Sequence, residues 1–214
     1  MEKDRIVYPY ITEYLRKVRR PRDGKLGELE VWARQEGYPV SEPETSDLLE
    51  IICRLKNPKN ILEIGTCVGF SALLMHSCCD GKITTLDRYE AMYSVAEKNF
   101  SDFGAEDRIK LVKGNAVEIL PTLTEKYDLI FIDAAKGQYP VFLENSLRLL
   151  APNGIIIADN IFFNGYVAEG KPDRHRNKTI VTRLDEFITR LEAEESLKTV
   201  LLPISDGVSL SYKI

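Results

Sequence analysis

Short apolar runs alternate with amphipathic segments of helical length from Asn60 onward, and this alternation constrains the fold more than any other feature. The apolar runs are expected to form buried strands at Ile61–Ile64, Ile83–Leu86, Ile109–Val112, Leu129–Ile132 and Ile155–Ala158. The intervening segments are expected to be helices, at about Ser71–Cys78, Glu90–Phe103, Ala116–Thr124 and Tyr139–Leu150. Strands that alternate with helices are typical of a parallel sheet that is covered on both faces.

The last part of the chain departs from this pattern. A long helix is expected near Lys178–Leu197, followed by strands at roughly Thr199–Pro203 and Gly207–Tyr212. The turn Ser205-Asp206-Gly207 is too short for a parallel crossover, so these two strands should pair antiparallel. The predicted fold class is therefore α/β, with a Rossmann-like sheet of seven mostly parallel strands and an antiparallel last strand.

Helical periodicity fills the region before the first strand. Residues 6–57 carry apolar positions at helical spacing, and Pro21, Pro39 and Pro43 punctuate them. The sequence contains no internal repeat, low-complexity tract or flexible linker. We therefore expect one compact unit, in which an N-terminal helical cover (residues 1–59) lies over the sheet domain (residues 60–214).

Charge and cysteine content exclude several classes of protein. The 214 residues carry a net charge of −4, which argues against a uniformly basic surface that binds nucleic acid without specificity. The four cysteines lack both C-x-x-C spacing and the density of a disulfide scaffold, and the charged N-terminus lacks the apolar segment of a signal peptide. We therefore expect a cytoplasmic protein with no membrane association. A chain of this length folds without a metal, so any metal that it binds is expected to be functional.

A glycine-containing turn follows the first predicted strand and precedes a helix. Glu63, Gly65, Gly69 and Ser71 lie in or beside it, where glycines let backbone N–H groups approach a ligand at the positive end of a helix. The G-x-x-x-G spacing is neither the G-x-G-x-x-G of dinucleotide-binding folds nor a P-loop, so nucleotide phosphates fit poorly. The alternative is an ordinary connection between a strand and a helix.

Polar residues after the second and third strands favour an adenosine-type ligand. Asp87 ends the second strand, where an acid can accept hydrogen bonds from both hydroxyls of a ribose. The alternative is that Asp87 caps the helix that begins near Glu90. Asn115 and Ala116 follow the third strand, where a side-chain amide can reach an adenine edge, but Asn115 is equally suited to cap a helix.

Two acids and an amide mark the ends of the fourth and fifth strands. Asp133, Asp159 and Asn160 should meet at one edge of the sheet, because the carboxyl ends of parallel strands share an edge. Carboxylate and amide oxygens suit Mg²⁺, or a similar divalent ion such as Mn²⁺ or Ca²⁺. Lys136 lies three residues after Asp133, where a nearby cation and desolvation would allow it to act as a general base. The alternatives are helix caps for the acids and a solvated surface position for Lys136.

The motifs together resemble a known family. Residues 61–71 (ILEIGTCVGFS), Asp133-Ala134-Ala135-Lys136 and Asp159-Asn160 are similar to the metal-dependent O-methyltransferases of the catechol and caffeoyl-CoA type, which use S-adenosylmethionine (SAM). The resemblance covers almost the whole chain. Within that group, residues 131–139 (FIDAAKGQY) and 159–168 (DNIFFNGYVA) look most like the bacterial tRNA 5-hydroxyuridine methyltransferases.

The resemblance implies roles for individual residues. Those assigned to SAM are Glu63, Gly65 and Ser71 for the methionine end, Asp87 for the ribose, Asn115 and Ala116 for the adenine, with Ser41 in a covering segment and Gly69 and Asp133 as further contacts. The metal ligands would be Asp133, Asp159 and Asn160, with Lys136 at the acceptor oxygen. The chain departs from the family at Asn115, where an aspartate is usual; the amide keeps an acceptor oxygen but lacks the charge.

Two basic stretches run against the acidic average. The first lies within residues 16–25, and the second includes Lys171, Arg174, Arg176, Lys178 and Arg183. The second follows the Asp159 strand, so Arg174, Arg176 and Lys178 are candidates for contacts to RNA phosphates. A flipped or single-stranded base would then find an aromatic partner in Phe162, Phe163 or Tyr166. The alternatives are solvated charged faces, and aromatics that belong to the core or an interface.

The expected function is SAM- and divalent-metal-dependent O-methylation. The favoured acceptor is 5-hydroxyuridine at the tRNA wobble position, which would become 5-methoxyuridine. The alternative acceptor is a small catechol or another hydroxylated aromatic or vicinal diol. A third hypothesis, a SAM-binding adaptor without catalysis, is disfavoured by the complete set Asp133, Lys136, Asp159 and Asn160. The helical cover is expected to contribute to a homodimer.

Overall fold

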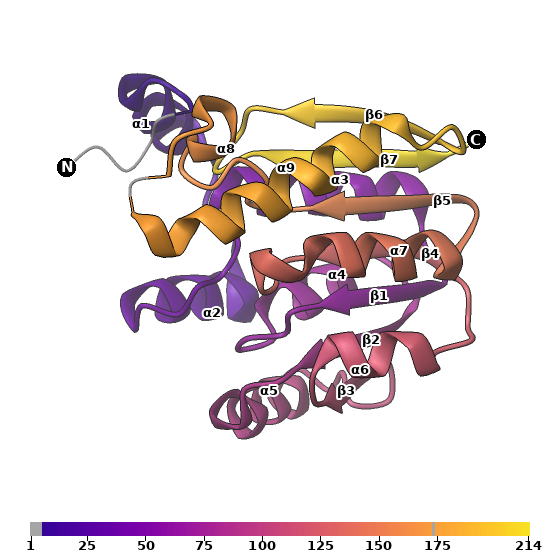
Figure 1. Cartoon of the computed structure of the whole chain (residues 1–214). Coiled ribbons are helices and arrows are strands. Elements are labelled where there is room, and N and C mark those ends of the chain that lie inside the picture. The colour runs from indigo at the N-terminus through magenta and orange to yellow at the C-terminus, as the bar shows by residue number, and fades with distance from the viewer. Residues whose placement is uncertain (1–5, 173) are drawn as a thin grey trace.

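A seven-stranded sheet forms the centre of the structure, a computed structural model that describes residues 6–172 and 174–214 (Figure 1). The strands run in the order β3-β2-β1-β4-β5-β7-β6. Their bounds are Asn60–Ile64 (β1), Lys82–Asp87 (β2), Ile109–Lys113 (β3), Tyr127–Ile132 (β4), Leu150–Ala158 (β5), Leu197–Leu202 (β6) and Val208–Lys213 (β7). Only the pairs β5–β7 and β6–β7 are antiparallel, which confirms the predicted sheet with its reversed last strand.

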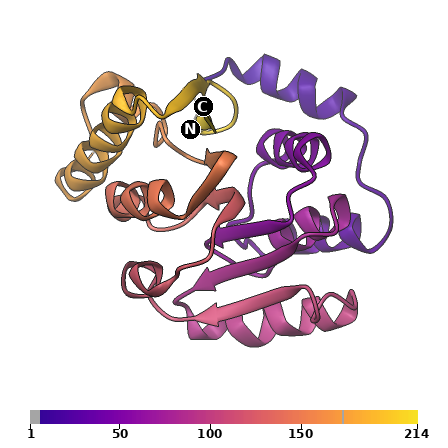
Figure 2. The same ribbon diagram turned by 90° about the vertical axis from the view of Figure 1, so that its right-hand side faces the viewer.

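Helices cover both faces of the sheet (Figure 2). One face packs against α2 (Gly24–Gln35), α3 (Pro43–Lys56), α4 (Phe70–Cys78) and α5 (Glu90–Asp102). The other packs against α7 (Tyr139–Leu149), α9 (Lys178–Ala193) and the short α6 (Ala116–Ile119). The strands alternate between two cores: Ile61 faces α4, whereas Leu62 and Ile64 face α7 and α9. This two-sided burial explains why the central strands are apolar at nearly every position.

Three boundaries differ from the sequence prediction for identifiable reasons. The helix expected over Ala116–Thr124 becomes 3₁₀ helix at Leu120–Thr122, because Pro121 has no N–H to continue the α-helical ladder. Strand β5 begins at Leu150, which pairs with Tyr127. The pairing of β4 with β5 then shifts register before Leu129, so residues 151–154, which were expected to form a loop between helix and strand, lie within β5. Helix α9 stops at Ala193, and Leu197 opens β6 as a buried residue.

Parallel register brings the ends of the inner strands to one edge of the sheet. Ile64 pairs with Ile132, and Ile132 pairs with Ala158, so the residues that follow β1, β4 and β5 are neighbours. Figure 1 shows the arrowheads of β1 and β5 on one side, which is also where α9 begins. The residues of the predicted site therefore converge here.

Ion pairs attach the first helix of the cover. Helix α1 (Pro9–Val18) has no buried residue, although its sequence is strongly amphipathic. Instead, arginines in and after α1 reach acids on α2, on α3 and just before it: Arg16 pairs with Glu42 and Glu44, Arg19 with Glu30 and Asp47, and Arg22 with Glu30, Asp47 and Glu50. Three of the six basic residues within residues 16–25 are thus paired with acids of the protein, whereas Lys17, Arg20 and Lys25 are exposed.

Within the described ranges, no helix combines the length and the apolar character that crossing a bilayer requires.

Arg22 should be worth far more to stability than an exposed arginine of the same network. Its side chain is only 10% exposed, and it pairs with Glu30, which is 7% exposed, so Arg22→Met leaves a buried carboxylate short of a partner. We expect a loss of about 3 kcal/mol in the free energy of unfolding, measured by urea denaturation. Arg54→Met is the matched control, because Arg54 is 57% exposed and should cost under about 1 kcal/mol. Equal costs would contradict a buried anchor at Arg22.

Candidate active site

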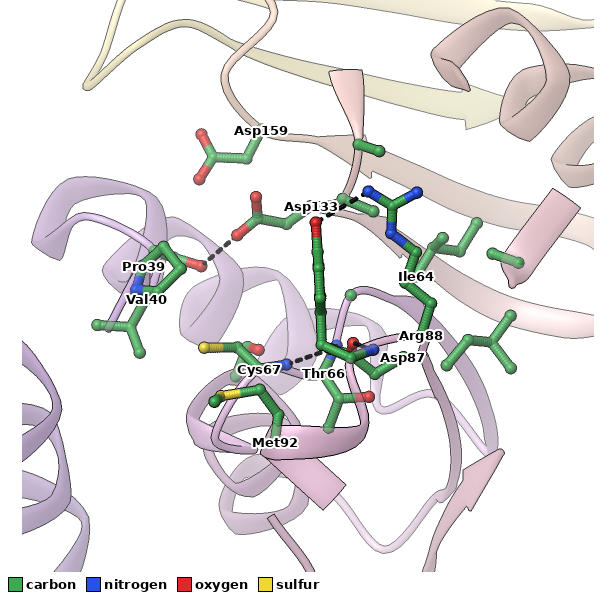
Figure 3. Close-up of a pocket in the computed structure, with 18 of the residues that line it drawn as sticks. Pro39, Val40, Ile64, Thr66, Cys67, Asp87, Arg88, Met92, Asp133 and Asp159 are labelled. Atoms are coloured by element: carbon green, nitrogen blue, oxygen red, sulfur yellow. Dashed lines mark hydrogen bonds between the residues drawn. The ribbon is translucent and has the colours of Figure 1, made fainter. Parts of the chain in front are cut away.

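A cavity of about 610 Å³ opens at the carboxyl edge of the sheet (Figure 3). Its floor comes from the segments after β1, β2, β3, β4 and β5, and residues 38–42 of the cover form part of its wall. Of the residues assigned to SAM, those that line it are Ser41, Gly65, Ser71, Asp87, Asn115, Ala116 and Asp133. Lys136, Asp159 and Asn160 line the same cavity. The structure therefore brings the predicted cofactor and metal residues into one space.

The two glycines of the turn have different tasks. Gly65 has a φ of +112°, and a Cβ there would lie 1.9 Å from the backbone oxygen of Asp133. The turn after β1 therefore lies directly against the turn after β4. Gly69 does not line the cavity: it has a φ of +85°, precedes α4, and would direct a Cβ into Phe100 at 2.5 Å. Its role in the structure is close packing.

Glu63 lies behind the cavity wall and is fully buried. Its Oε2 accepts a hydrogen bond from the hydroxyl of Thr85 at 2.5 Å, while no partner in the described part of the chain reaches Oε1 with good geometry. Burial raises the pKa of Glu63 to about 8, although the neighbouring hydroxyls of Ser71 and Thr85 lower it. A cationic group in the cavity would compensate for this buried carboxyl.

Asp87 organises the glycine turn. Its Oδ2 accepts hydrogen bonds from the backbone N–H groups of Thr66 (3.1 Å) and Cys67 (2.8 Å), and Oδ1 accepts one from Tyr89 N–H (2.8 Å). These bonds are drawn in part in Figure 3. Asp87 does not cap α5, whose N-cap is Tyr89. The carboxylate thus ties β2 to the turn after β1, at the edge where a ribose would lie.

Asn115 caps a helix in the structure. Its side-chain oxygen accepts a hydrogen bond from Val117 N–H at 3.2 Å, at the start of α6. This confirms the capping alternative without removing Asn115 from the cavity wall, where Ala116 also lies. A carbonyl oxygen has two lone pairs, so one remains for a ligand.

Asp133, which is half-buried, and Asp159, which is buried, lie side by side at the far end of the cavity from Asp87. Figure 3 shows both carboxyl groups directed toward the segment of Pro39 and Val40. Burial raises the pKa of Asp133, although Lys136 and Ser41 lower it. Burial and then the charge of Asp133 raise the pKa of Asp159 well above its ordinary value. Two acids that repel each other in a buried site favour the arrival of a cation.

Lys136 and Asn160 complete this group. The Nζ atom of Lys136 donates to the side-chain oxygen of Asn160 at 2.9 Å. Asn160 has a φ of +55°, a left-handed conformation that asparagine tolerates better than most residues. The strand end and this backbone turn together direct the amide toward Lys136.

The oxygen set fits a divalent ion. Among the described residues, no group of three or more His, Cys, Asp or Glu side chains is placed to hold a metal, so a zinc-type centre has no candidate there. The set Asp133, Asp159 and Asn160 is of another kind, two carboxylates and an amide. Asp159 Oδ2 is buried and finds no hydrogen-bond partner in the described part of the chain, which leaves one carboxylate oxygen open to a cation.

Several contacts that support this site were not predicted from the sequence. The Tyr139 hydroxyl donates to the backbone oxygen of Asp159 at 2.8 Å and fixes the end of β5. The Ser41 hydroxyl donates to Asp133 Oδ2 at 3.3 Å, and Arg34 holds the backbone oxygen of Ser41 at 2.6 Å. Thr45 reaches Asp159. Tyr139 lies in the FIDAAKGQY motif and could have been found there, whereas contacts from the cover have no local signal.

The second basic stretch stands outside the cavity. Arg174 and Lys178 are exposed near the start of α9, and neither lines the cavity; the side chain of Arg176 lies outside the described part of the structure. Figure 1 places the start of α9 on the site side of the sheet. Of the three candidate aromatics, Phe162 packs against Gly207, and Phe163 and Tyr166 form an edge-on pair at 5.9 Å.

Comparison with known proteins identifies the family. The O-methyltransferase family matches residues 26–214. A catechol O-methyltransferase of Niastella koreensis is 31% identical over 180 residues, which cover 79% of this chain and 80% of that protein. The crystal structure of an S-adenosylhomocysteine (SAH)-bound methyltransferase of Podospora anserina superposes with a TM-score of 0.85 at 30% identity, covering 96% of this chain and 94% of the other. An O-methyltransferase of Bacillus cereus in complex with SAH gives 0.83 at 25% identity, covering 96% and 97%.

The match over most of the chain agrees with the geometry of the cavity. The glycine turn, the acid after β2 and the paired carboxylates occupy the edge of the sheet at which open α/β folds bind ligands. The chain therefore belongs to the family of SAM-dependent O-methyltransferases of the catechol and caffeoyl-CoA type.

Proposed function

We propose that the protein uses SAM and a divalent cation, Mg²⁺ or a relative such as Mn²⁺ or Ca²⁺, to methylate 5-hydroxyuridine at the tRNA wobble position, giving 5-methoxyuridine. The observation that carries the chemistry is the pair of carboxylates, Asp133 (half-buried) and Asp159 (buried), beside Lys136 at one end of the cavity. The exposed basic residues at the start of α9 support tRNA as the acceptor.

The cavity supports SAM along its length. Asp87, at the end of β2, would accept hydrogen bonds from the ribose, and Asn115 with Ala116 would flank the adenine. Gly65 and Ser71 border the methionine end, where the buried carboxyl of Glu63 would pair with the amino group. The Podospora and Bacillus structures hold SAH, the product of methyl transfer.

Positioning and electrostatics would account for the chemistry. Asp133, Asp159 and Asn160 would hold the cation, which lowers the pKa of an acceptor hydroxyl when bound. Lys136 stands within reach of Asn160, so its Nζ would hydrogen-bond the acceptor oxygen and take up its proton. The enclosed cavity would align the acceptor oxygen with the donor methyl group, and no covalent enzyme intermediate is required.

Charge around the site mouth supports an RNA acceptor. Arg174 and Lys178 are exposed on the site side of the sheet. Phosphates would be drawn to the α9 side, and Phe163 with Tyr166 would offer a surface for the base.

A small catechol is the second candidate acceptor. The name of the Niastella relative favours it, and the oxygen set at Asp133 and Asp159 suits a vicinal diol as well as a hydroxyuridine. Purified protein with SAM should be offered tRNA lacking the modification and, separately, free catechol. Nucleoside mass spectrometry that finds 5-methoxyuridine supports the tRNA proposal; methylated catechol with unmodified tRNA would overturn it.

A homodimer also remains a proposal. Apolar side chains that are exposed in the single chain support it: Tyr10, Tyr14 and Val18 on α1, Ile51 and Leu55 on α3, and Tyr212 on β7. Sedimentation of the purified protein tests it.

Asp159→Ala should abolish metal-dependent turnover without unfolding the chain. Loss of one carboxylate removes Lewis-acid stabilisation worth several kcal/mol, so kcat should fall by about two to three orders of magnitude. Asp185→Ala is the control, because Asp185 is exposed on α9. Full activity of the wild-type protein in excess chelator would refute the metal assignment.

Glu63→Gln should stabilise the cofactor-free protein at alkaline pH. The carboxyl titrates near 4.5 when unfolded and near 8 when folded, so the folded state holds the proton more tightly. Wild-type stability from this group is full below about pH 4.5 and is lost as the pH rises to 8. The variant should therefore be close to wild type at pH 5 and exceed it at pH 9, by on the order of 5 kcal/mol in urea denaturation.

The same variant tests the role of Glu63 toward SAM. It lacks the charge that pairs with the amino group, so it should bind SAH about tenfold more weakly by calorimetry at pH 9. Glu125→Gln, at an exposed position, should change neither measurement. Unchanged SAH affinity would move Glu63 out of the cofactor site.

Arg174→Glu combined with Lys178→Glu should impair tRNA far more than a small phenol. Charge reversal repels phosphate, so kcat/KM for tRNA should fall at least about tenfold while that for catechol stays level, and the tRNA defect should shrink as salt rises. Lys110→Glu with Lys198→Glu is the matched control, since both lysines are exposed near the starts of β3 and β6. Equal losses with both acceptors would count against an RNA-binding wall.

A further inference from the structure

The two oxygens of the Asp159 carboxylate have unequal surroundings. Oδ1 accepts the backbone N–H of Asn160 at 2.7 Å and the hydroxyl of Thr45 at 3.3 Å. Oδ2 is buried and has no hydrogen-bond partner in the described ranges. The carboxylate is therefore held through one oxygen and presents the other.

Thr45 reaches this carboxylate from outside the sheet domain. It lies in the first turn of α3, is fully buried, and stands 114 residues before Asp159 in the sequence. The N–H of Asn160 belongs to the strand end itself, so Thr45 supplies the contact that the sheet cannot. A backbone N–H alone leaves the carboxyl group free to turn about its Cβ–Cγ bond, whereas two donors on one oxygen restrict it.

Ser205 lies beside the Thr45 hydroxyl, as a second acceptor for the hydrogen that Thr45 can donate to Asp159. Its Oγ lies 3.2 Å from Thr45 Oγ1, and it donates to Glu44 Oε2 at 3.3 Å. The hydroxyl groups of Thr45 and Ser205 thus have two hydrogens for three contacts, which are Thr45 to Asp159, Thr45 to Ser205 and Ser205 to Glu44. If both acids are ionised, Thr45 donates to Asp159 and Ser205 donates to Glu44, which satisfies both carboxylates.

The turn that carries Ser205 also holds the loop after Asp159. The N–H of Ile161 donates to Gly207 O at 3.0 Å, and the N–H of Phe162 donates to Asp206 O at 3.0 Å. On the other side, Glu44 pairs with Arg16 of α1 at 2.9 Å. One connected group of contacts therefore extends from the cover, through Thr45 and the β6–β7 turn, to both sides of Asp159.

We propose that Thr45 is a positioning residue for Asp159: its hydroxyl fixes the carboxylate so that Oδ2 faces the cation, and the cover thereby completes the metal site of the sheet domain. This inference rests on the proposed cation site. Groups that orient metal ligands typically change metal affinity by about 10- to 100-fold when removed.

Mn²⁺ binding to the full chain tests the role of Thr45 without any methyl acceptor. The protein is freed of cations with a chelator, and the dissociation constant for Mn²⁺ is measured by electron paramagnetic resonance. Thr45→Val keeps the shape and removes the hydroxyl, so its dissociation constant should rise about 10- to 100-fold. Thr45→Ser restores the hydroxyl and should return to within about twofold of wild type.

Thr199→Val is the matched control. Thr199 shares a hydroxyl pair with Ser211 at 2.9 Å on β6 and β7, outside the cavity, so Mn²⁺ binding should stay at the wild-type level. SAH affinity without cation should be unchanged in Thr45→Val, because Thr45 does not line the cavity. Should Thr45→Val not fold, Thr45→Ala removes the same hydroxyl and carries the same expectation.

The outcomes separate this inference from the proposed function. Wild-type Mn²⁺ affinity in a folded variant without the Thr45 hydroxyl overturns the positioning role and leaves the metal site intact. Weak binding in Thr45→Ser as well as Thr45→Val overturns it too, because the hydroxyl is then not the cause. Absence of Mn²⁺ binding in wild type overturns both proposals together.

Discussion

The site depends on the register between β4 and β5. Because Ile132 pairs with Ala158, the next residues, Asp133 and Asp159, leave the sheet side by side. The bond from Asp159 N–H to Ile132 O, at 2.9 Å, keeps the two strands paired up to this point. A slip by one residue would send one carboxyl to the opposite face. The closeness of these two acids, and with it their mutual repulsion, therefore follows from backbone pairing that the apolar strands stabilise.

Much of this architecture could be predicted from local patterns. The acids at the strand ends, the glycine turn after β1 and the short turn before β7 each have a signal in the local sequence. The structure contains all three where the sequence predicts them. Prediction was less accurate where one residue alters a pattern, as Pro121 does in the helix after Asn115. The predicted bounds were also less accurate where strand pairing continues through an irregular segment, as it does in β5 after Leu150.

Contacts from the cover lay beyond sequence reasoning. The partnership of Thr45 with Asp159 joins residues 114 positions apart, and neither position carries a periodic signal for the other. The ion pairs of the first basic stretch were equally unpredictable. A run of arginines suggests an exposed basic surface, and only the folded chain shows that acids of α2 and α3 lie beside Arg16, Arg19 and Arg22. Long-range pairing of polar side chains depends on the assembled fold, whereas apolar periodicity depends on a single element.

Cover and floor are held by different forces. The cover's first helix buries no residue and relies on ion pairs, several of them partly exposed, which dissolved salt screens. The floor is closed by contact: at Gly65 there is no room for even a methyl group beside the backbone of Asp133. The turn after β1 and the turn after β4 must consequently move as one block. Rising ionic strength should therefore weaken the attachment of α1 while leaving the contact between the two turns unchanged.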